Sequence, residues 1–437
     1  MGAIASRHGQ RLPPELALEA ERIERAARAA GLGFPALEFH LLDARDVNGV
    51  AAYGGFPVRY PSWRHGMEFE RLDKGYSWGL SKIYELVINT DPVVAYLVRS
   101  NSTLEQKLVM AHVCGHADFF THNVWFSATD RGMLDTMGHH ATLVRRSIDR
   151  HGLEQVERFL DLALSLETLI DPYLPLRRRL ARGKRLPAGG LGYDVLGFLA
   201  ERASLEPWQR EIVALVRDEA YYFQPQRMTK IMNEGWASFW HSRLLTGGIL
   251  DATEIVDFAD CHSGATQQAP GRVNPYKLGI ELWRYAERTG HDIFRLRRLH
   301  DDASFLDELI DERFVEESEL FLFGVNARSG RAEVTDRDWR AVKERLLLDV
   351  AWGGLPRIEL VREAAGALAL VHHHDGRDLE LSAAGETLER LGTLWGGPVE
   401  LATRVGESAK RLVFRDGELE VQTLEEDAAP STGEGGS

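Results

Sequence analysis

Two histidines, His112 and His116, lie four residues apart in an apolar segment of the sequence. The segment follows Ser102-Thr-Leu-Glu105, whose first and last side chains predict a capping box at the start of a helix. Residues four apart lie on one helical face, so both imidazoles can reach a single metal ion. Burying two imidazoles on an apolar face is costly unless they are hydrogen-bonded or metal-bound. The alternative is a pair of ordinary core or surface histidines.

A second predicted helix, Met232-Asn-Glu-Gly-Trp-Ala-Ser-Phe-Trp-His241, carries Glu234 and His241 two helical turns apart. A carboxylate among so many aromatic side chains needs a partner. That partner is either a metal ion held together with the two histidines or an arginine, Arg227 or Arg243.

Taken together, the two segments resemble the zincin metallopeptidases, in which His-x-x-x-His supplies two zinc ligands. The stretch 233–238 resembles the helix that carries the third ligand in gluzincin aminopeptidases. Two departures stand out: Val113 replaces the usual general-base Glu, and 118 positions separate His116 from Glu234. The resemblance implies that His112, His116 and Glu234 bind a divalent metal, zinc, without the usual activation of bound water.

Another group would then have to accept the proton. Glu219 is the first candidate, because it is an acidic residue on an otherwise apolar helix face, where burial would raise its pKa. The alternative is a structural pair between Glu219 and an arginine. His241 and His262 are further candidates as proton carriers or additional ligands, which would allow a dinuclear site. Asp118 could orient an imidazole from outside the site.

Composition and charge exclude several classes of function. The 437 residues, 44% of them hydrophobic, are enough for two or three domains. A formal charge of −14 without a concentrated basic patch argues against a nucleic acid partner. No stretch approaches the roughly 20 apolar residues that span a bilayer, and no signal-peptide pattern is present, so we expect a cytoplasmic protein without a membrane span. Cys114 and Cys261 are too few for a disulfide framework, and we expect buried thiols, with Cys261 beside His262 as the alternative of a metal ligand.

The predicted elements indicate a mainly α-helical chain with α+β parts. We expect an N-terminal helix within residues 1–35, a mostly helical domain with the zincin-like site over 36–330, a small α+β domain over 331–425 and a disordered acidic tail over 426–437. Residues 39–61 predict loops with short strands. The small domain is predicted to contain helices at 334–350 and 384–394 and strands at 357–361, 368–373, 378–381, 399–403, 411–414 and 419–422.

Several ordered motifs resemble the SpoVR (stage V sporulation protein R) family. The motifs are 112–120, Pro225-Gln226, 232–234 with Phe239-Trp-His241, His262-Ser-Gly264 and 274–279, with further matches at 60–63 and 88–92. The resemblance covers roughly residues 35–425. It implies a bacterial cytoplasmic protein that is linked in spore formers to spore cortex (peptidoglycan) formation and commonly encoded beside a PrkA-type serine kinase. The resemblance does not specify a molecular activity.

We therefore expect the three ligands to bind a divalent metal ion, zinc, with Glu219, His241 and His262 around the open position. The reaction would be hydrolysis of an amide or similar bond by a peptidase-like or amidase-like metallohydrolase. Two alternatives stay open. One is a scaffold or regulatory partner that kept a zincin-type core and lost catalysis with the missing Glu at position 113. The other is a redox or oxygen-handling site that holds iron.

Overall fold

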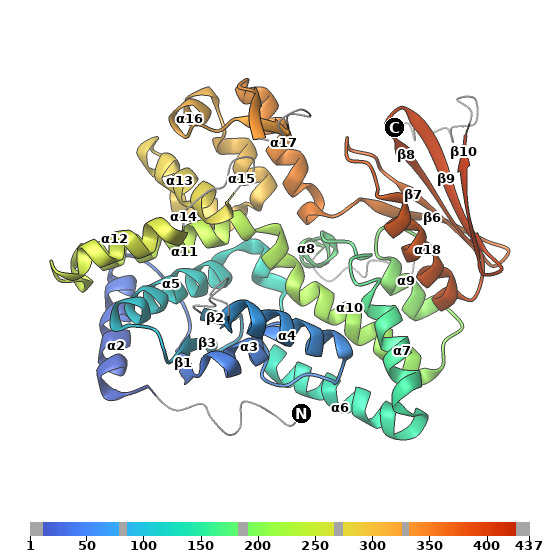
Figure 1. Ribbon diagram of the computed structural model, residues 1–437, viewed down its shortest axis with the longest axis horizontal. Helices are drawn as coiled ribbons and strands as arrows, with labels where there is room; N and C mark the ends of the chain where they lie inside the picture. Colours follow the sequence, from blue (N-terminus) through green and yellow to red (C-terminus); the bar gives the residue numbers. More distant parts are fainter. Residues whose placement is uncertain (1–11, 78–84, 182–190, 266–273, 326–331, 425–437) are drawn as a thin grey trace. The chain divides into compact units, whose positions relative to one another are not determined.

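The structure, a computed structural model, is mainly helical with smaller β-sheets, as the sequence indicates (Figure 1). It describes residues 12–77, 85–181, 191–265, 274–325 and 332–424. The predicted tail over 426–437 lies outside these ranges. Within them, every helix falls short of the combined length and hydrophobicity that crossing a bilayer requires.

The chain divides into two compact units, and each is built from two separate stretches. The first contains Met1–Arg145 and Pro225–Val350, and the second contains Arg146–Gln224 and Ala351–Ser437. This division differs from the consecutive domain ranges that we expect from the sequence. That those ranges fold independently stays a prediction.

The first unit begins with helix α2 (Pro14–Ala29), which buries Ile23 and Ala27 on one face, in agreement with the N-terminal helix expected within residues 1–35. A three-stranded sheet follows, in the order β1 (Leu37–Leu42), β3 (Val93–Val98) and β2 (Glu85–Ile88). The central strand β3 is buried along its whole length, parallel to β1 and antiparallel to β2. The sheet therefore forms part of the core.

Helices α3 (Ala44–Ala52) and α4 (Trp63–Ser77) follow β1 in the sequence, with a short connection between them. The prediction of loops with short strands over residues 39–61 was therefore wrong for α3. The helix is short and contains Gly49, so its buried positions Val47 and Val50 do not form a recognisable period in the sequence.

Three helices form the centre of the first unit: α5 (Thr103–His122), α11 (Lys230–Leu244) and α13 (Pro275–Arg288). Helix α11 packs against both of the others. The predicted capping box at the start of α5 is confirmed, because Ser102 Oγ accepts from Glu105 N at 3.2 Å and Glu105 Oε2 accepts from Ser102 N at 2.7 Å.

Small residues allow these helices to approach closely. A Cβ atom at Gly115 would lie 2.6 Å from the Cα atom of Ala237, and a Cβ atom at Gly235 would lie 2.4 Å from the carbonyl carbon of Gly279. Both obstacles are backbone atoms, which cannot move aside as a side chain can. The glycines in the two sequence motifs are therefore packing residues that set the spacing between α5, α11 and α13.

A buried carboxyl group caps the helix that carries Glu234. Asp302 accepts hydrogen bonds from the backbone N–H groups of Ile231 (2.8 Å) and Met232 (2.9 Å) in the first turn of α11. The indole of Trp283 donates to the carbonyl oxygen of Met232 at 3.0 Å. These contacts fix the first turn of α11, and Asp302 satisfies two backbone N–H groups that have no partner within the helix.

The remaining elements of the first unit surround this centre. They are η1 (Val124–Ala128), η2 (Leu245–Ile249), α12 (Glu254–Ala265), α14 (Ile293–Leu299), α15 (Asp302–Leu309), α16 (Glu312–Glu317), the antiparallel pair β4 (Leu322–Val325) and β5 (Ala332–Asp336), and α17 (Trp339–Val350). Helices α6 (Met133–His151) and α10 (Pro207–Met228) contribute residues to both units.

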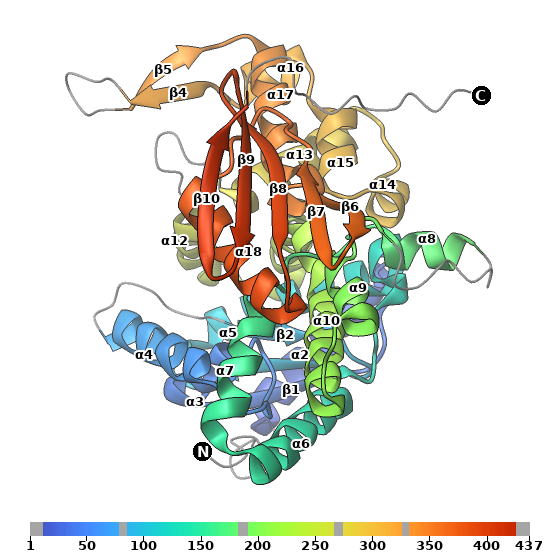
Figure 2. The same cartoon turned by 90° about the vertical axis from the view of Figure 1, so that its right-hand side faces the viewer.

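The second unit contains a five-stranded sheet in the order β10-β9-β8-β7-β6, with α18 (Leu381–Trp395) packed against β8 and β9 (Figure 2). Strands β7 and β8 are parallel and the other neighbours are antiparallel. The strands are β6 (Ile358–Ala364), β7 (Ala367–His372), β8 (Val399–Val405), β9 (Ser408–Arg415) and β10 (Glu418–Thr423). The other elements are α7 (Leu153–Leu164), α8 (Leu174–Leu180), α9 (Val195–Arg202) and η3 (Ala351–Gly354).

Five of the six strands predicted for this region are confirmed, and the one at 378–381 is wrong. Leu381 begins α18 instead, and Glu380 accepts hydrogen bonds from the N–H groups of Ser382 and Ala383 at the start of that helix. The alternation of Leu379 and Leu381 resembled a strand because it is too short to distinguish from a helix start.

Candidate metal centre

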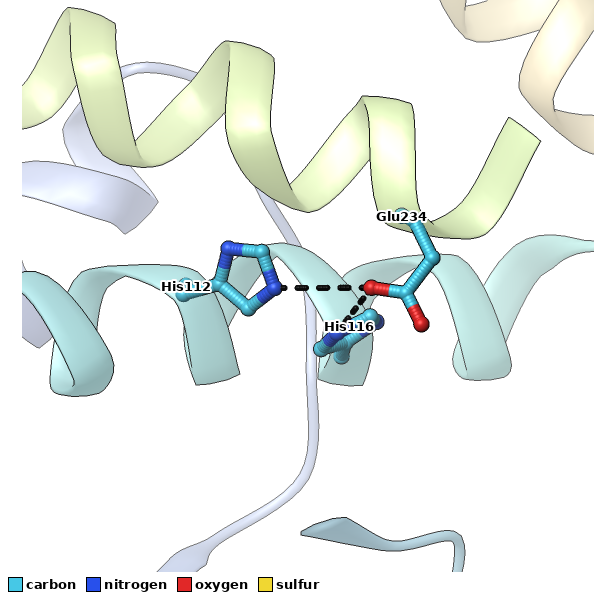
Figure 3. Close-up of side chains that lie close together, drawn as sticks. All are labelled: His112, His116 and Glu234. Atoms are coloured by element: carbon cyan, nitrogen blue, oxygen red, sulfur yellow. Dashed lines mark ion pairs between the residues drawn. The ribbon is translucent and has the colours of Figure 1, made fainter. Parts of the chain in front are cut away.

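The structure brings His112, His116 and Glu234 together between α5 and α11 (Figure 3). Glu234 Oε2 lies 3.7 Å from His112 Nε2 and 3.5 Å from His116 Nε2. One ligand atom from each residue lies within 4.8 Å of the other two. Both histidines are only 6% exposed. The predicted ligands thus converge, while their binding of a metal ion stays a prediction.

The outer nitrogen of each imidazole is held by a residue of α11. His112 Nδ1 lies 2.8 Å from His241 Nδ1, and His116 Nδ1 lies 2.9 Å from Asn233 Oδ1. These contacts pair the start of α11 with His116 and its end with His112, so the two helices run antiparallel. Because both Nδ1 atoms are engaged, both Nε2 atoms face Glu234.

Burial would raise the pKa of Glu234, but the two imidazoles that face its carboxylate outweigh this effect and lower the pKa below its usual range. Glu234 is therefore ionised at neutral pH. A buried carboxylate with two nitrogen atoms beside it is an environment that attracts a cation.

Aromatic rings form the walls around the cluster. Phe120 stacks on His116 with ring centroids 5.8 Å apart, and Tyr276 lies parallel to His112 with centroids 6.5 Å apart. Tyr276 belongs to the first turn of α13 and is partly exposed. Sequence reasoning gave Tyr276 no role, although the Asn-Pro-Tyr motif that starts α13 was a usable signal. Tyr276 places a phenol ring at the edge of the cluster.

The remaining predicted residues have different positions. His241 lies behind His112, on the side away from Glu234. Glu219 is a buried residue of α10 in the second unit, and its role as proton acceptor stays a prediction. The side chains of His262 and Cys261 lie outside the described residues, although the backbone of both belongs to α12.

Asp118 does not orient either of the two ligand histidines in the contacts that the structure describes. It accepts hydrogen bonds from Gly33 N (2.8 Å) and Trp236 Nε1 (2.9 Å), and it forms a buried ion pair with Arg297. Its imidazole contact is with His122, at 3.3 Å. Asp118 therefore ties α5 to α11 through Trp236 and supports the cluster by fixing the helices.

The alternative of an arginine partner for Glu234 is not supported in the case of Arg243, because Arg243 pairs with Glu287 on α13 at 2.7 Å. Val113 is fully buried in the apolar core, where a carboxylate would be costly. Cys114 is buried beside it, and burial raises the pKa of its thiol, which keeps it a neutral core residue.

The geometry defines a helical protein in which two antiparallel helices hold a cluster of two histidines and one carboxylate. A sequence model of the SpoVR family, described as "SpoVR like protein", matches residues 11–186 and 177–354. The chain belongs to the SpoVR family, which confirms the resemblance found in the motifs. It is 28% identical to "Uncharacterized protein YcgB" of Escherichia coli (strain K12), over 90% of this chain and 92% of that protein. No solved structure matches the chain.

Proposed function

We propose that the protein is a metal-dependent hydrolase in which His112, His116 and Glu234 bind one divalent ion, zinc. The observation that carries the proposal is the convergence of two Nε2 atoms and one carboxylate oxygen at separations of 3.5 and 3.7 Å. These separations are longer than normal hydrogen bonds. They are close to the edge of a tetrahedron with metal–ligand bonds of about 2.1 Å, which is about 3.4 Å.

The donor set also supports zinc. Two imidazoles and one carboxylate leave the fourth position open, as in catalytic zinc sites. Glu234 supplies one negative charge, because its lowered pKa keeps it ionised. The motif resemblance to gluzincin aminopeptidases is consistent with the same donor set.

Bound zinc would lower the pKa of a water molecule to about 7 and so supply a nucleophile for an amide or similar bond. Val113 cannot accept the proton. Glu219 is our proposed acceptor on the sequence argument, with His262 and His241 as alternatives. Of these, His241 contacts the outer nitrogen of His112, so in this position it would orient and polarise that ligand.

The cellular setting is proposed from the family alone. We expect the protein to act in the cytoplasm, in a process that serves cortex formation in spore formers, and to work with a PrkA-type serine kinase. Co-purification of the kinase with the tagged full chain supports this setting. Its absence from both native and cross-linked preparations contradicts it.

Metal analysis of the full chain, purified and dialysed against metal-free buffer after zinc loading, tests the centre. We expect one zinc per chain, and its loss in the Ala variants of the three ligands. His139→Ala is the matched control, because His139 is an exposed histidine of the same unit. Stoichiometric iron instead of zinc would support the oxygen-handling alternative. A metal-free protein with an unchanged fold in His112→Ala contradicts the proposal.

One observation favours a second candidate, a non-catalytic scaffold: the residue in the place of the general base, Val113, is part of the core. Complementation of a gene-deletion strain separates the two. If Glu219→Gln abolishes complementation while the zinc content persists, catalysis is supported. If only surface changes in 331–425 abolish it, the scaffold is supported.

A further inference from the structure

Asn233, the residue before Glu234, contacts one of the two histidines directly. Its Oδ1 atom lies 2.9 Å from His116 Nδ1, and both side chains are buried. Neutral imidazole has one N–H donor and one nitrogen acceptor, whereas an amide oxygen only accepts. The contact therefore requires the proton of His116 to sit on Nδ1, which leaves the lone pair on Nε2.

We infer that Asn233 is a positioning residue that holds His116 in the tautomer required for metal binding. The inference rests on the proposed metal centre for its functional meaning. A histidine binds a metal ion through an unprotonated nitrogen, and a partner on its other nitrogen sets which one that is. The other nitrogen of His116, Nε2, is the one that faces Glu234 at 3.5 Å.

The described Nδ1 contact of the second histidine is of a different kind. His112 Nδ1 meets His241 Nδ1, and an imidazole nitrogen can either donate or accept. The contact alone leaves the tautomer of His112 open. Among the described contacts of the two histidines, the one with Asn233 therefore fixes a single tautomer, that of His116.

The backbone around Asn233 is fixed in the way a positioning residue needs. Asp302 holds the N–H groups of the two preceding residues, and the Asn233 N–H donates to the carbonyl oxygen of Thr229 at 2.8 Å. Two residues later, Gly235 lies against Gly279. The Asn233 side chain therefore leaves a rigid turn, and its oxygen has little freedom to move away from His116.

Two measurements on the full chain test the inference. The first is zinc affinity, by competition with a chromophoric chelator. Asn233→Leu removes the acceptor and should weaken zinc binding about 10- to 100-fold. Asn233→Asp keeps an acceptor oxygen and should bind zinc at least as tightly as the wild type. Asn48→Leu makes the same change at a buried asparagine of α3, and should alter stability without altering zinc affinity.

The second measurement is the tautomer of His116 in the metal-free protein, by ¹⁵N NMR with histidine-selective labelling and assignment from His116→Ala. We expect a proton on Nδ1 in the wild type and in Asn233→Asp, and a shift toward Nε2 in Asn233→Leu. A wild-type His116 whose Nδ1 carries no proton overturns the inference, and so does unchanged zinc affinity in Asn233→Leu or weak binding in Asn233→Asp. If the wild type shows the expected tautomer but binds no zinc, the proposed function fails and the tautomer control stands.

Discussion

Asp302 allows a sharp prediction, because it is a buried carboxyl group at the start of the helix that carries Glu234. Burial raises the pKa of Asp302 to about 8, although the N–H groups of Ile231 and Met232 act in the opposite direction. In the unfolded chain an aspartate ionises near its ordinary pKa of 3.8. The folded protein therefore holds a proton that the unfolded chain releases. Its stabilising contribution is complete below pH 3.8 and is lost as the pH rises toward 8.

The magnitude follows from the proton count. While the folded state holds one more proton than the unfolded state, the free energy of unfolding falls by about 1.4 kcal/mol per pH unit. Between pH 5 and pH 7.5 this amounts to about 3 kcal/mol. Asp302→Asn cannot ionise, so the free energy of unfolding of the wild type minus that of the variant should fall by this order over the same range.

The assay is urea unfolding of both proteins, followed by tryptophan fluorescence at half-unit steps of pH. Asp292→Asn, the same change at an exposed cap of α14, is the matched control. If the two backbone donors dominate instead, the carboxylate is ionised in the folded state. The difference would then rise between pH 3 and pH 5 and stay flat above, which would refute the argument from burial.

Three further predictions concern packing, capping and metal removal. Gly235→Ala should destabilise the protein by about 1–3 kcal/mol in urea unfolding, because the new methyl group meets backbone atoms of Gly279. Gly138→Ala is the control and should not destabilise the protein, because its methyl group meets open space. Ser102→Ala should cost about 1 kcal/mol by removing the cap of α5, and Ser102→Asp should restore most of it; an equal loss in both variants would contradict the capping role. Removal of zinc by a chelator should lower the melting temperature of the wild type and leave that of His116→Ala unchanged. At a hundredfold excess of zinc over its Kd, the stabilisation that the chelator removes is about 3 kcal/mol. A melting temperature that does not respond to the chelator in either protein would count against a bound ion.

Local features of the fold could be predicted from the sequence because their causes are local. The start of α5 follows from the side chains of Ser102 and Glu105, and the shared face of His112 and His116 follows from the helical period. The family motif identified Glu234. The helix α3 was missed because a nine-residue helix with an internal glycine shows no clear period.

The resemblance indicated that α5 and α11 meet, but the contacts that pair them could not be derived from the sequence, since they join residues far apart along the chain. Asn233 meets His116 across 117 positions, and Asp118 meets Trp236 across 118. Gly115 permits the close approach to Ala237, but a glycine in a motif does not say which residue approaches it. The outer partners of the two histidines, and the supporting role of Asp118, needed the structure.

X-ray absorption at the zinc edge, on the zinc-loaded full chain, tests whether His112, His116 and Glu234 hold the ion. We predict a first shell of nitrogen and oxygen at about 2.0–2.1 Å with the outer-shell pattern of two imidazoles in the wild type, and no such spectrum in His116→Ala, which loses the ion. A spectrum without imidazole scattering, or one that is identical in the wild type and His116→Ala, would contradict the claim that His112, His116 and Glu234 form a metal centre.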